Sequence, residues 1–284
     1  MSGFFWTLPI AFALTVATLH LLLGRGWAGD LAIDTPNSRS LHSAPTPRVG
    51  GAIMVPAALA SSLSYSQMPG LLLVLAAVLC AVSFIDDRWG LPVVFRLVLH
   101  AAAAVALCQS LLPALPPLGF GLAVVMLVWS INLFNFMDGT DGLAGGMALI
   151  GFAVFGWTLL DAMPDMAQLA LCLAAAAAGF LLFNFAPARV FMGDAGSVPL
   201  GFLAGGIGLT GWLQDAWPLW FPLLVFSPFV VDATATLMRR VLRREKFWQA
   251  HRDHYYQRLV RMGWPHRRLA LIEYLLMAAC GVSA

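Results

Sequence analysis

Long apolar stretches separated by short polar segments run through the whole chain. A helix needs about 20 consecutive apolar residues to span a bilayer. The stretches lack the period-two alternation of apolar and polar positions that marks strands of a membrane β-barrel. Because lipid offers the backbone no hydrogen-bond partners, we expect each stretch to form a helix. Ten such runs can be marked, at residues 3–23, 51–66, 70–85, 93–112, 118–137, 143–160, 166–185, 197–213, 217–238 and 269–284.

Composition agrees with an all-α, polytopic membrane protein of about ten transmembrane helices. Of the 284 residues, 60% are hydrophobic and only 11% are charged, whereas soluble domains carry about 25% charged residues. This balance excludes an ordinary soluble enzyme, a secreted disulfide scaffold and a coiled coil. The four cysteines are scattered in apolar runs without a CxxC pair, which predicts neither a zinc site nor a disulfide framework. We interpret residues 1–284 as a single integral membrane domain.

Three of the runs need individual comment. The run 3–23 is too long and too aromatic for a signal peptide, so we interpret it as the first spanning helix. The run 217–238 contains three prolines, which predict a kinked or broken helix. It also contains Asp232, which is either a functional group or an ion-pair partner of the arginines one to two turns further on. The run 269–284 is short, and it spans the membrane, lies at its interface or is a truncated helix.

Basic residues lie on one side of the predicted helices. Of the 16 Lys and Arg residues, all but Arg96 lie in alternate loops, and Arg96 lies about one turn inside its run near the same face. The positive-inside rule therefore puts these loops in the cytoplasm and the N-terminus outside. The net charge of +2 is too small to indicate a nucleic-acid partner. The predicted cytoplasmic loops are residues 24–50, 86–92, 138–142, 186–196 and 239–268.

Carboxylates and amides gather where the apolar runs meet these cytoplasmic loops. Three of them share one helical face because they are spaced by three residues. Several carboxylates at one depth repel each other unless cations neutralise them. Mg²⁺ prefers oxygen ligands and bridges carboxylates to phosphates, so we expect Mg²⁺ here, with Mn²⁺ as a substitute. The group consists of Asp86, Asp87, Asn132, Asn135, Asp138, Asp141, Asn184 and Asp194.

Groups suited to binding phosphate lie close to these acids. Two glycines flank Asp194 and allow a close backbone approach before a helix N-terminus, which is a natural anion site. The loop 239–268 carries ten Lys or Arg residues. Within this loop, His251 and His254 share a helical face on either side of Arg252. Together these residues suit a pyrophosphate, with a metal on one side and cationic groups on the other.

Each of these residues also has a simpler interpretation. Asn132 and Asn135 would serve equally well as interhelical hydrogen-bonding groups. Asp138 and Asp141 would form an Asx turn, and Asp194 would cap the following helix. The basic loop would bind lipid headgroups as a surface helix. Their joint occurrence at one membrane face favours a shared site over a set of independent caps.

In order and placement, four sequence blocks resemble the family of polyprenyl-phosphate N-acetylhexosamine-1-phosphate transferases. The likeness extends from about Asp34 to Arg268, which is most of the chain. This family usually has about eleven spanning helices, whereas the chain ends in a short tenth run. The last loop is similar to the subgroup that serves O-antigen and capsule sugars. The blocks are Arg39-Ser-Leu-His42 through Gly50-Gly51, Asp86-Asp87, Asn132 through Gly145, and Phe191 through Ser197.

The resemblance implies roles for individual residues. Asp194 would be the main protein ligand of Mg²⁺, with Asn135 and Asp86 beside the metal. Asp86 and Asp87 would handle the acceptor phosphate, and His251 would complete the catalytic group with these acids. The implied substrate-binding residues are Asn132, Asp138, Asp141, Arg39, His42, Arg96, Arg252 and His254.

The reaction implied by the resemblance joins a sugar phosphate to a lipid. Polyprenyl phosphate in the inner leaflet attacks the β-phosphorus of a UDP-N-acetylhexosamine, and UMP leaves. Asp141 and its loop resemble the part that recognises uracil, while Arg252 would sit at the pyrophosphate. The resemblance further implies a bacterial inner-membrane enzyme with a cytoplasmic active site, a role in starting O-antigen or a related glycan, and homodimers. The sequence leaves the particular N-acetylhexosamine open.

Other function classes are compatible with parts of the pattern. A secondary transporter or lipid flippase also places acidic residues in membrane helices, but near the bilayer midplane. Here nearly all the acids lie at one face, with Asp232 as the main exception. A lipid phosphatase would need a Pro-Ser-Gly-His block, which the sequence lacks.

Overall fold

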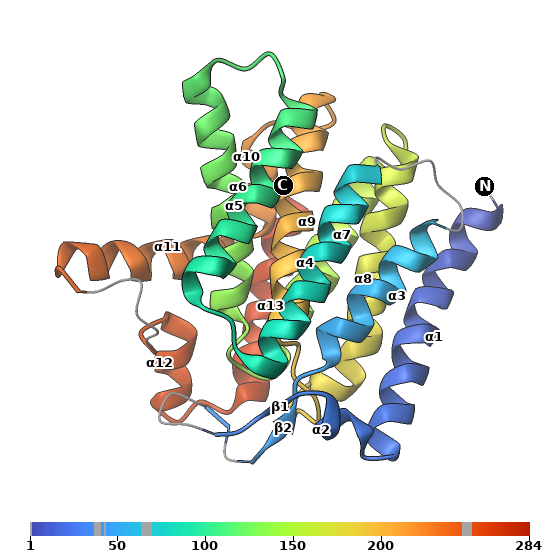
Figure 1. The fold of residues 1–284 in the computed structure, drawn as a ribbon, viewed down its shortest axis with the longest axis vertical. Coiled ribbons are helices and arrows are strands. Elements are labelled where there is room, and N and C mark those ends of the chain that lie inside the picture. Colours follow the sequence, from blue (N-terminus) through green and yellow to red (C-terminus); the bar gives the residue numbers. More distant parts are fainter. Residues whose placement is uncertain (1, 37–40, 43, 64–69, 246–251) are drawn as a thin grey trace.

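The computed structural model describes residues 2–36, 41–42, 44–63, 70–245 and 252–284. In this part of the chain the protein is almost entirely helical, which confirms the predicted all-α fold (Figure 1). One short strand pair, β1 (Ile33–Asp34) with β2 (Thr46–Pro47), is antiparallel. The helices are α1 (Ser2–Gly24), α2 (Trp27–Leu31), α3 (Gly50–Leu63), α4 (Gly70–Trp89), α5 (Val93–Leu111), α6 (Pro117–Met137), α7 (Leu143–Leu159), α8 (Pro164–Asn184), α9 (Asp194–Leu213), α10 (Trp220–Val225), α11 (Ser227–Leu242), α12 (Tyr255–Arg261) and α13 (His266–Ser283).

All ten apolar runs form helices, in agreement with the prediction. Six described helices are long and apolar enough to cross a membrane, namely α4, α5, α6, α8, α9 and the part of α1 at Trp6–Gly24. The helices α3 and α7 are apolar but shorter. The chain is therefore a multi-pass membrane protein, while the count of ten spans stays a prediction.

The run 217–238 is broken, as its prolines predicted. It forms α10 and α11, which meet at Phe226, where φ is −96° and ψ is 15°. Pro228 stands at the start of α11, where its fixed φ suits the first turn of a helix. Figure 1 shows α11 lying across the other helices and projecting from the side of the bundle. Its side chains Val231, Met238 and Leu242 are exposed, so this helix presents an apolar face to the bilayer.

The helix α9 packs tightly because several of its positions are glycines. A Cβ on Gly201 would lie 2.5 Å from the carbonyl oxygen of Ser130 on α6. The Ser130 hydroxyl donates to the carbonyl oxygen of Gly201 at 2.7 Å. At the other end, Gly51 at the start of α3 lies directly against Gly196 of α9. These close approaches between small residues hold α9 against α6 and α3.

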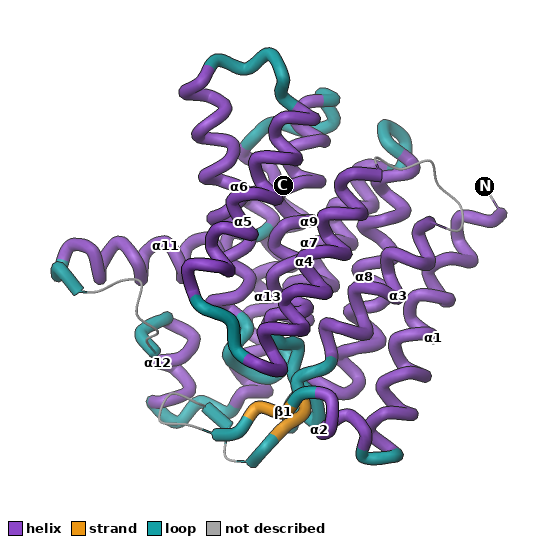
Figure 2. The backbone as a smooth tube through the Cα atoms, viewed as in Figure 1, coloured by secondary structure: helices purple, strands orange, loops and turns teal. Residues whose placement is uncertain are grey.

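The backbone ties the sequence blocks together at one end of the bundle. The N–H groups of Gly50 and Gly51 donate to the carbonyl oxygens of Phe191 and Met192 at 2.9 and 2.8 Å. The N–H of Phe191 donates to the carbonyl oxygen of Pro47 in β2 at 2.8 Å. Figure 2 shows the strand pair at the end of the bundle remote from the N-terminus. Segments far apart in the sequence thus meet at the face predicted to be cytoplasmic.

Candidate functional site

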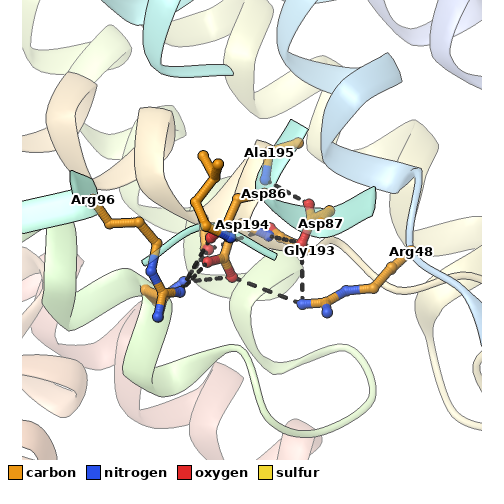
Figure 3. Close-up of polar contacts among 10 residues, drawn as sticks. Arg48, Asp86, Asp87, Arg96, Gly193, Asp194 and Ala195 are labelled. Atoms are coloured by element: carbon orange, nitrogen blue, oxygen red, sulfur yellow. Dashed lines mark hydrogen bonds and ion pairs between the residues drawn. The ribbon is translucent and has the colours of Figure 1, made fainter. Parts of the chain in front are cut away.

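The centre of the site is the first turn of α9, which begins at Asp194 (Figure 3). The carboxylate of Asp87, at the end of α4, accepts the backbone N–H groups of Asp194 and Ala195 at 3.0 and 2.9 Å. Gly193 has a φ of 73°, and a Cβ there would lie 2.5 Å from Oδ2 of Asp87. A glycine is therefore required at 193 both by its conformation and by the approach of Asp87.

Two arginines connect three carboxylates at this point (Figure 3). Arg48 lies 3.1 Å from Asp87 and 3.8 Å from Asp194. Arg96, on α5, lies 3.1 Å from Asp86 and 3.2 Å from Asp194. The side chain of Asp87 is 1% exposed, whereas that of Asp194 is 17% exposed. Of Asp87 and Asp194, Asp194 is therefore the carboxylate that is open to a ligand, and both arginines contact it.

Arg48 is a site residue that the sequence prediction missed. Burial lowers the pKa of its guanidinium, but the charges of Asp87 and Asp194 outweigh burial and raise that pKa. The side chain is therefore a permanent cation between two acids. The only signal in the sequence is its position in the block that runs from Arg39 through Gly50-Gly51, one of the four that carry the family resemblance.

The face predicted from the spacing in α6 is only partly realised. The amide of Asn135 donates to Oδ1 of Asp194 at 2.8 Å and to Ser197 at 3.1 Å. The amide of Asn132 instead donates to the carbonyl oxygen of Val128 in its own helix, at 2.7 Å. Asn135 thus joins the centre, while Asn132 lies one turn away and bonds to backbone.

Asp138, directly after α6, also lies in the field of this centre. Burial raises the pKa of its carboxyl group well above the usual value, and the charges of Asp194 and Asp87 add to this effect. Arg48 and a hydrogen bond from the backbone of Gly193 act in the opposite direction. Because burial and nearby negative charges raise its pKa, a cation or a hydrogen-bond donor beside Asp138 would stabilise the charged form of its carboxyl group.

Asp141 has its own set of partners. It accepts the backbone N–H of Ala188 at 3.0 Å and lies 3.3 Å from Nδ1 of His266, at the start of α13. Burial acts to raise its pKa, but His266, the Ala188 N–H and the charge of His42 outweigh burial and lower it. The His42 ring packs edge-to-face on Phe191 with centroids 4.8 Å apart. The charge of His42 thus acts on Asp141, and the structure adds His266, which the sequence prediction missed.

The basic loop contacts α6 and α11. His254 is buried, and its Nδ1 lies 3.1 Å from Oδ1 of Asp232. The Tyr256 hydroxyl donates to the carbonyl oxygen of Phe136, next to Asn135, at 3.0 Å. Asp232 therefore contacts His254 of the basic loop rather than Arg239 or Arg240. In the described residues, both of these arginines contact Asp253. Arg252 is partly buried, and no described carboxylate pairs with it.

Two predicted residues cannot be located. Arg39, expected to bind substrate, and His251, expected to be catalytic, lie outside the described residues. The roles assigned to them stay predictions.

The oxygen donors around Asp194 suit a hard divalent cation. Asp194 supplies carboxylate oxygens, and the Asn135 amide N–H orients that carboxylate by donating to it. Mg²⁺ commonly takes one or two carboxylates together with water and substrate phosphates. Within the described ranges, no group of three or more His, Cys, Asp or Glu side chains could hold a metal. The protein residues therefore fit Mg²⁺ held mainly by Asp194 and completed by substrate oxygens and water, but do not form an all-protein metal cage.

An apolar cavity of about 310 Å³ lies between α6, α9 and the broken pair α10 and α11. It is lined by Leu115 and Gly119 at one end of α6 and by Leu133 and Phe134 at the other. Asn135 follows directly after Phe134. The cavity consequently extends along α6 towards the turn that carries the site, and its lining is suited to hydrocarbon.

Comparison with known proteins identifies relatives whose names describe transferases. A family model described as glycosyl transferase family 4 matches residues 70–212. A probable undecaprenyl-phosphate N-acetylglucosaminyl 1-phosphate transferase of Bacillus subtilis is 27% identical over 89% of this chain and 76% of its own length. A decaprenyl-phosphate N-acetylglucosaminephosphotransferase of Mycobacterium leprae is 32% identical over 86% and 74%. A phospho-N-acetylmuramoyl-pentapeptide-transferase of Picosynechococcus is 30% identical over 90% and 78%.

Proposed function

The chain belongs to glycosyl transferase family 4, and from this membership we propose that it transfers an N-acetylhexosamine 1-phosphate from a UDP-sugar to polyprenyl phosphate. The observation that carries the proposal is the meeting of Asp86, Asp87 and Asp194 through two arginines at the start of α9. Two of the similar relatives bear names that specify N-acetylglucosamine, which makes UDP-N-acetylglucosamine the first donor to test.

The donor diphosphate is proposed to bind over the N-terminus of α9. Arg48 and Arg96 supply two positive charges beside Asp194, whereas the first N–H groups of α9 already donate to Asp87. Bound Mg²⁺, held by Asp194 with Asn135 nearby, would neutralise charge on the diphosphate and on the leaving UMP. Arg252 is proposed to contact the same diphosphate from the basic loop.

The transfer itself is a displacement at phosphorus. An oxygen of the acceptor phosphate forms a bond to the β-phosphorus, and the bond from that phosphorus to the bridging oxygen breaks as UMP leaves with the electron pair. Such reactions depend on in-line positioning and charge neutralisation rather than on a covalent enzyme intermediate. Both oxygens of Asp87 already accept backbone N–H groups, which supports a role in ordering the site over a role as general base.

The cluster around Asp141 is proposed to receive the uracil. Phe191 offers an aromatic face, and Asp141 and His42 offer polar groups beside it. The Nε2 atom of His42 is buried without a hydrogen-bond partner among the described residues, so a ligand group would satisfy it. We therefore assign this cluster to the nucleobase and the start of α9 to the phosphates.

The acceptor chain is proposed to enter the apolar cavity beside α6. The cavity is lined in part by Val230 of α11, a helix with exposed apolar side chains, and by Phe134, which precedes Asn135 in the sequence. A polyprenyl tail there would leave its phosphate at the cytoplasmic boundary. We further propose that the protein lies in the bacterial inner membrane with its N-terminus outside and forms homodimers. It would act at the start of O-antigen or related glycan synthesis.

The test is a transfer assay with purified protein, radiolabelled UDP-N-acetylglucosamine, Mg²⁺ and undecaprenyl phosphate. We expect lipid-linked sugar and an equal amount of UMP. Asp194→Asn should lower turnover by a factor of about 10² or more, as loss of a charge-stabilising group often does. Asp215→Asn, at an exposed residue in the opposite loop, is the matched control and should behave as wild type. A transporter or flippase would form no product, and near-normal turnover of Asp194→Asn would refute the assigned centre.

A further inference from the structure

A polar stripe on α11 faces the segment that carries the histidine motif. Asp232, Thr236, Arg239 and Arg240 recur at helical spacing. Thr236 bonds to Asp232, and the group contacts the residues from Asp253 to Tyr256, while Arg240 also pairs with Glu245. The exposed apolar side chains of α11 lie at other positions of the same helix. The helix is therefore amphipathic. Its exposed apolar side chains lie on one face, and its polar side chains contact the basic loop from the other.

Asp232 is the most heavily used residue of this stripe. Its Oδ1 accepts the backbone N–H of Tyr255 at 2.9 Å and lies 3.1 Å from Nδ1 of His254, while its Oδ2 accepts the N–H of Tyr256 at 3.0 Å. The Thr236 hydroxyl donates to Oδ1 at 3.2 Å. A carboxylate only accepts, so it holds the proton of His254 on Nδ1 and directs Nε2 away from α11. One buried side chain thus fixes a ring orientation and the start of α12 together.

The start of α12 in turn supports the turn after α6. The Tyr256 hydroxyl donates to the carbonyl oxygen of Phe136 and accepts from the amide of Gln257 at 3.1 Å. The same hydroxyl lies so close to Gly139 that a Cβ there would collide with it. Asn135, adjacent to Phe136, donates to Asp194. A continuous series of contacts therefore leads from Asp232, through Tyr256 and α6, to the centre of the site.

We propose that Asp232 is a positioning residue for the transfer reaction, because its carboxylate sets the place of the His254 loop and of α12 against the turn that carries Asn135. This inference rests on the proposed function, since it assumes that the loop and the turn act on the UDP-sugar. Asp232 touches no substrate in this assignment. Its effect on catalysis passes through His254 and Tyr256 alone.

The role predicts a particular kinetic pattern. Asp232→Asn keeps the shape of the side chain but replaces one acceptor oxygen by a donor, so one of its hydrogen bonds becomes a clash of donors. We expect kcat/KM for the UDP-sugar to fall by about 10- to 100-fold, the usual effect of losing a group that orients an active-site residue. Asp232→Glu, which retains the carboxylate, should recover part of the loss. Thr236→Val, which leaves the carboxylate in place, should have the smaller effect.

A purely structural helix cap would give a different result. In that case Asp232→Asn would lower the melting temperature while kcat and KM of the folded fraction stayed at wild-type values, and the proposal would be overturned. Wild-type kcat/KM in Asp232→Asn, which is itself a neutral replacement of similar volume, would overturn the proposal as well.

A second measurement separates this inference from the proposed function. Trypsin cleavage after Arg258 and Arg261 on α12 should be faster in Asp232→Asn than in wild type and in the control Asp215→Asn. This readout needs no substrate. If wild type makes no lipid-linked sugar, the proposed function fails, whereas unchanged cleavage together with unchanged kinetics of an active enzyme refutes the positioning role of Asp232.

Discussion

Asp87 accepts the backbone N–H of Asp194 at 3.0 Å, so one acid of the site is the helix cap of another. The second oxygen of Asp87 accepts the N–H of Ala195, and Arg48 lies beside the same carboxylate. The geometry makes Asp194 dependent on Asp87, because the first turn of α9 begins where the Asp87 carboxylate holds it. The two acids of the adjacent pair consequently differ in role, since Asp86 pairs with Arg96 instead.

Substitutions at Asp87 should distinguish an ordering role from a general-base role. Asp87→Asn retains one oxygen that can accept an N–H of α9, whereas Asp87→Ala removes the cap and costs about 1 kcal/mol or more. For an ordering role we expect Asn to retain measurably more turnover than Ala, together with a higher melting temperature. A general-base role predicts that both variants are equally inactive. Initial rates and thermal unfolding in detergent, measured on both variants, decide between the two roles.

Arg48 should be as important as the predicted site residues. Its guanidinium lies near both Asp87 and Asp194, which a lysine ammonium, a compact point charge, reproduces poorly. We expect Arg48→Ala to lower kcat/KM by a factor of about 10² and Arg48→Lys to recover only part of it.

The matched control for Arg48 is Arg25→Ala. Arg25 stacks on Trp27 at 5.0 Å, outside the site, and its loss should leave kinetics unchanged. Wild-type kinetics for Arg48→Ala would contradict the assignment of Arg48 to the site.

Much of the fold was predictable because the bilayer restricts what an apolar run can do. The ten runs, the break near Phe226 and the gathering of acids at one face all follow from length, prolines and charge placement.

Contacts between distant segments were not predictable from periodicity. Asn132 and Asn135 share a helical face, yet only Asn135 reaches Asp194, because the start of α9 meets α6 at one turn only. His266 reaches Asp141 because α13 begins beside the turn after α6, which no local pattern encodes. For Asp232 the sequence left open a functional role or an ion pair with an arginine further along its helix, whereas in the structure its carboxylate accepts from the start of α12.

Acidification should abolish the stabilising effect of Asp141. Its pKa is lowered in the folded protein, so its contribution to stability is present above the ordinary Asp pKa of about 3.9 and is lost as pH falls through the lowered value. We expect Asp141→Asn to lower the melting temperature at about pH 7, with a difference that shrinks as pH falls below the ordinary Asp pKa of about 3.9 and through the lowered value. Thermal unfolding of both proteins across this range is the measurement. A difference that grew on acidification would contradict the contact with His266 and the Ala188 N–H.

Filling the apolar cavity should affect the lipid substrate selectively. Ala123 lines the cavity from α6, whereas Val125 on the same helix is 64% exposed and does not line it. A bulky side chain at 123 would occupy the space assigned to the polyprenyl tail, but it lies away from the donor groups around Asp194. We therefore expect Ala123→Phe to raise KM for undecaprenyl phosphate by about tenfold, an effect of about 1.4 kcal/mol, without changing KM for the UDP-sugar. Val125→Phe adds the same ring outside the cavity and should leave both constants unchanged. Equal effects of the two variants, or a change confined to the UDP-sugar, would remove the cavity from the path of the acceptor.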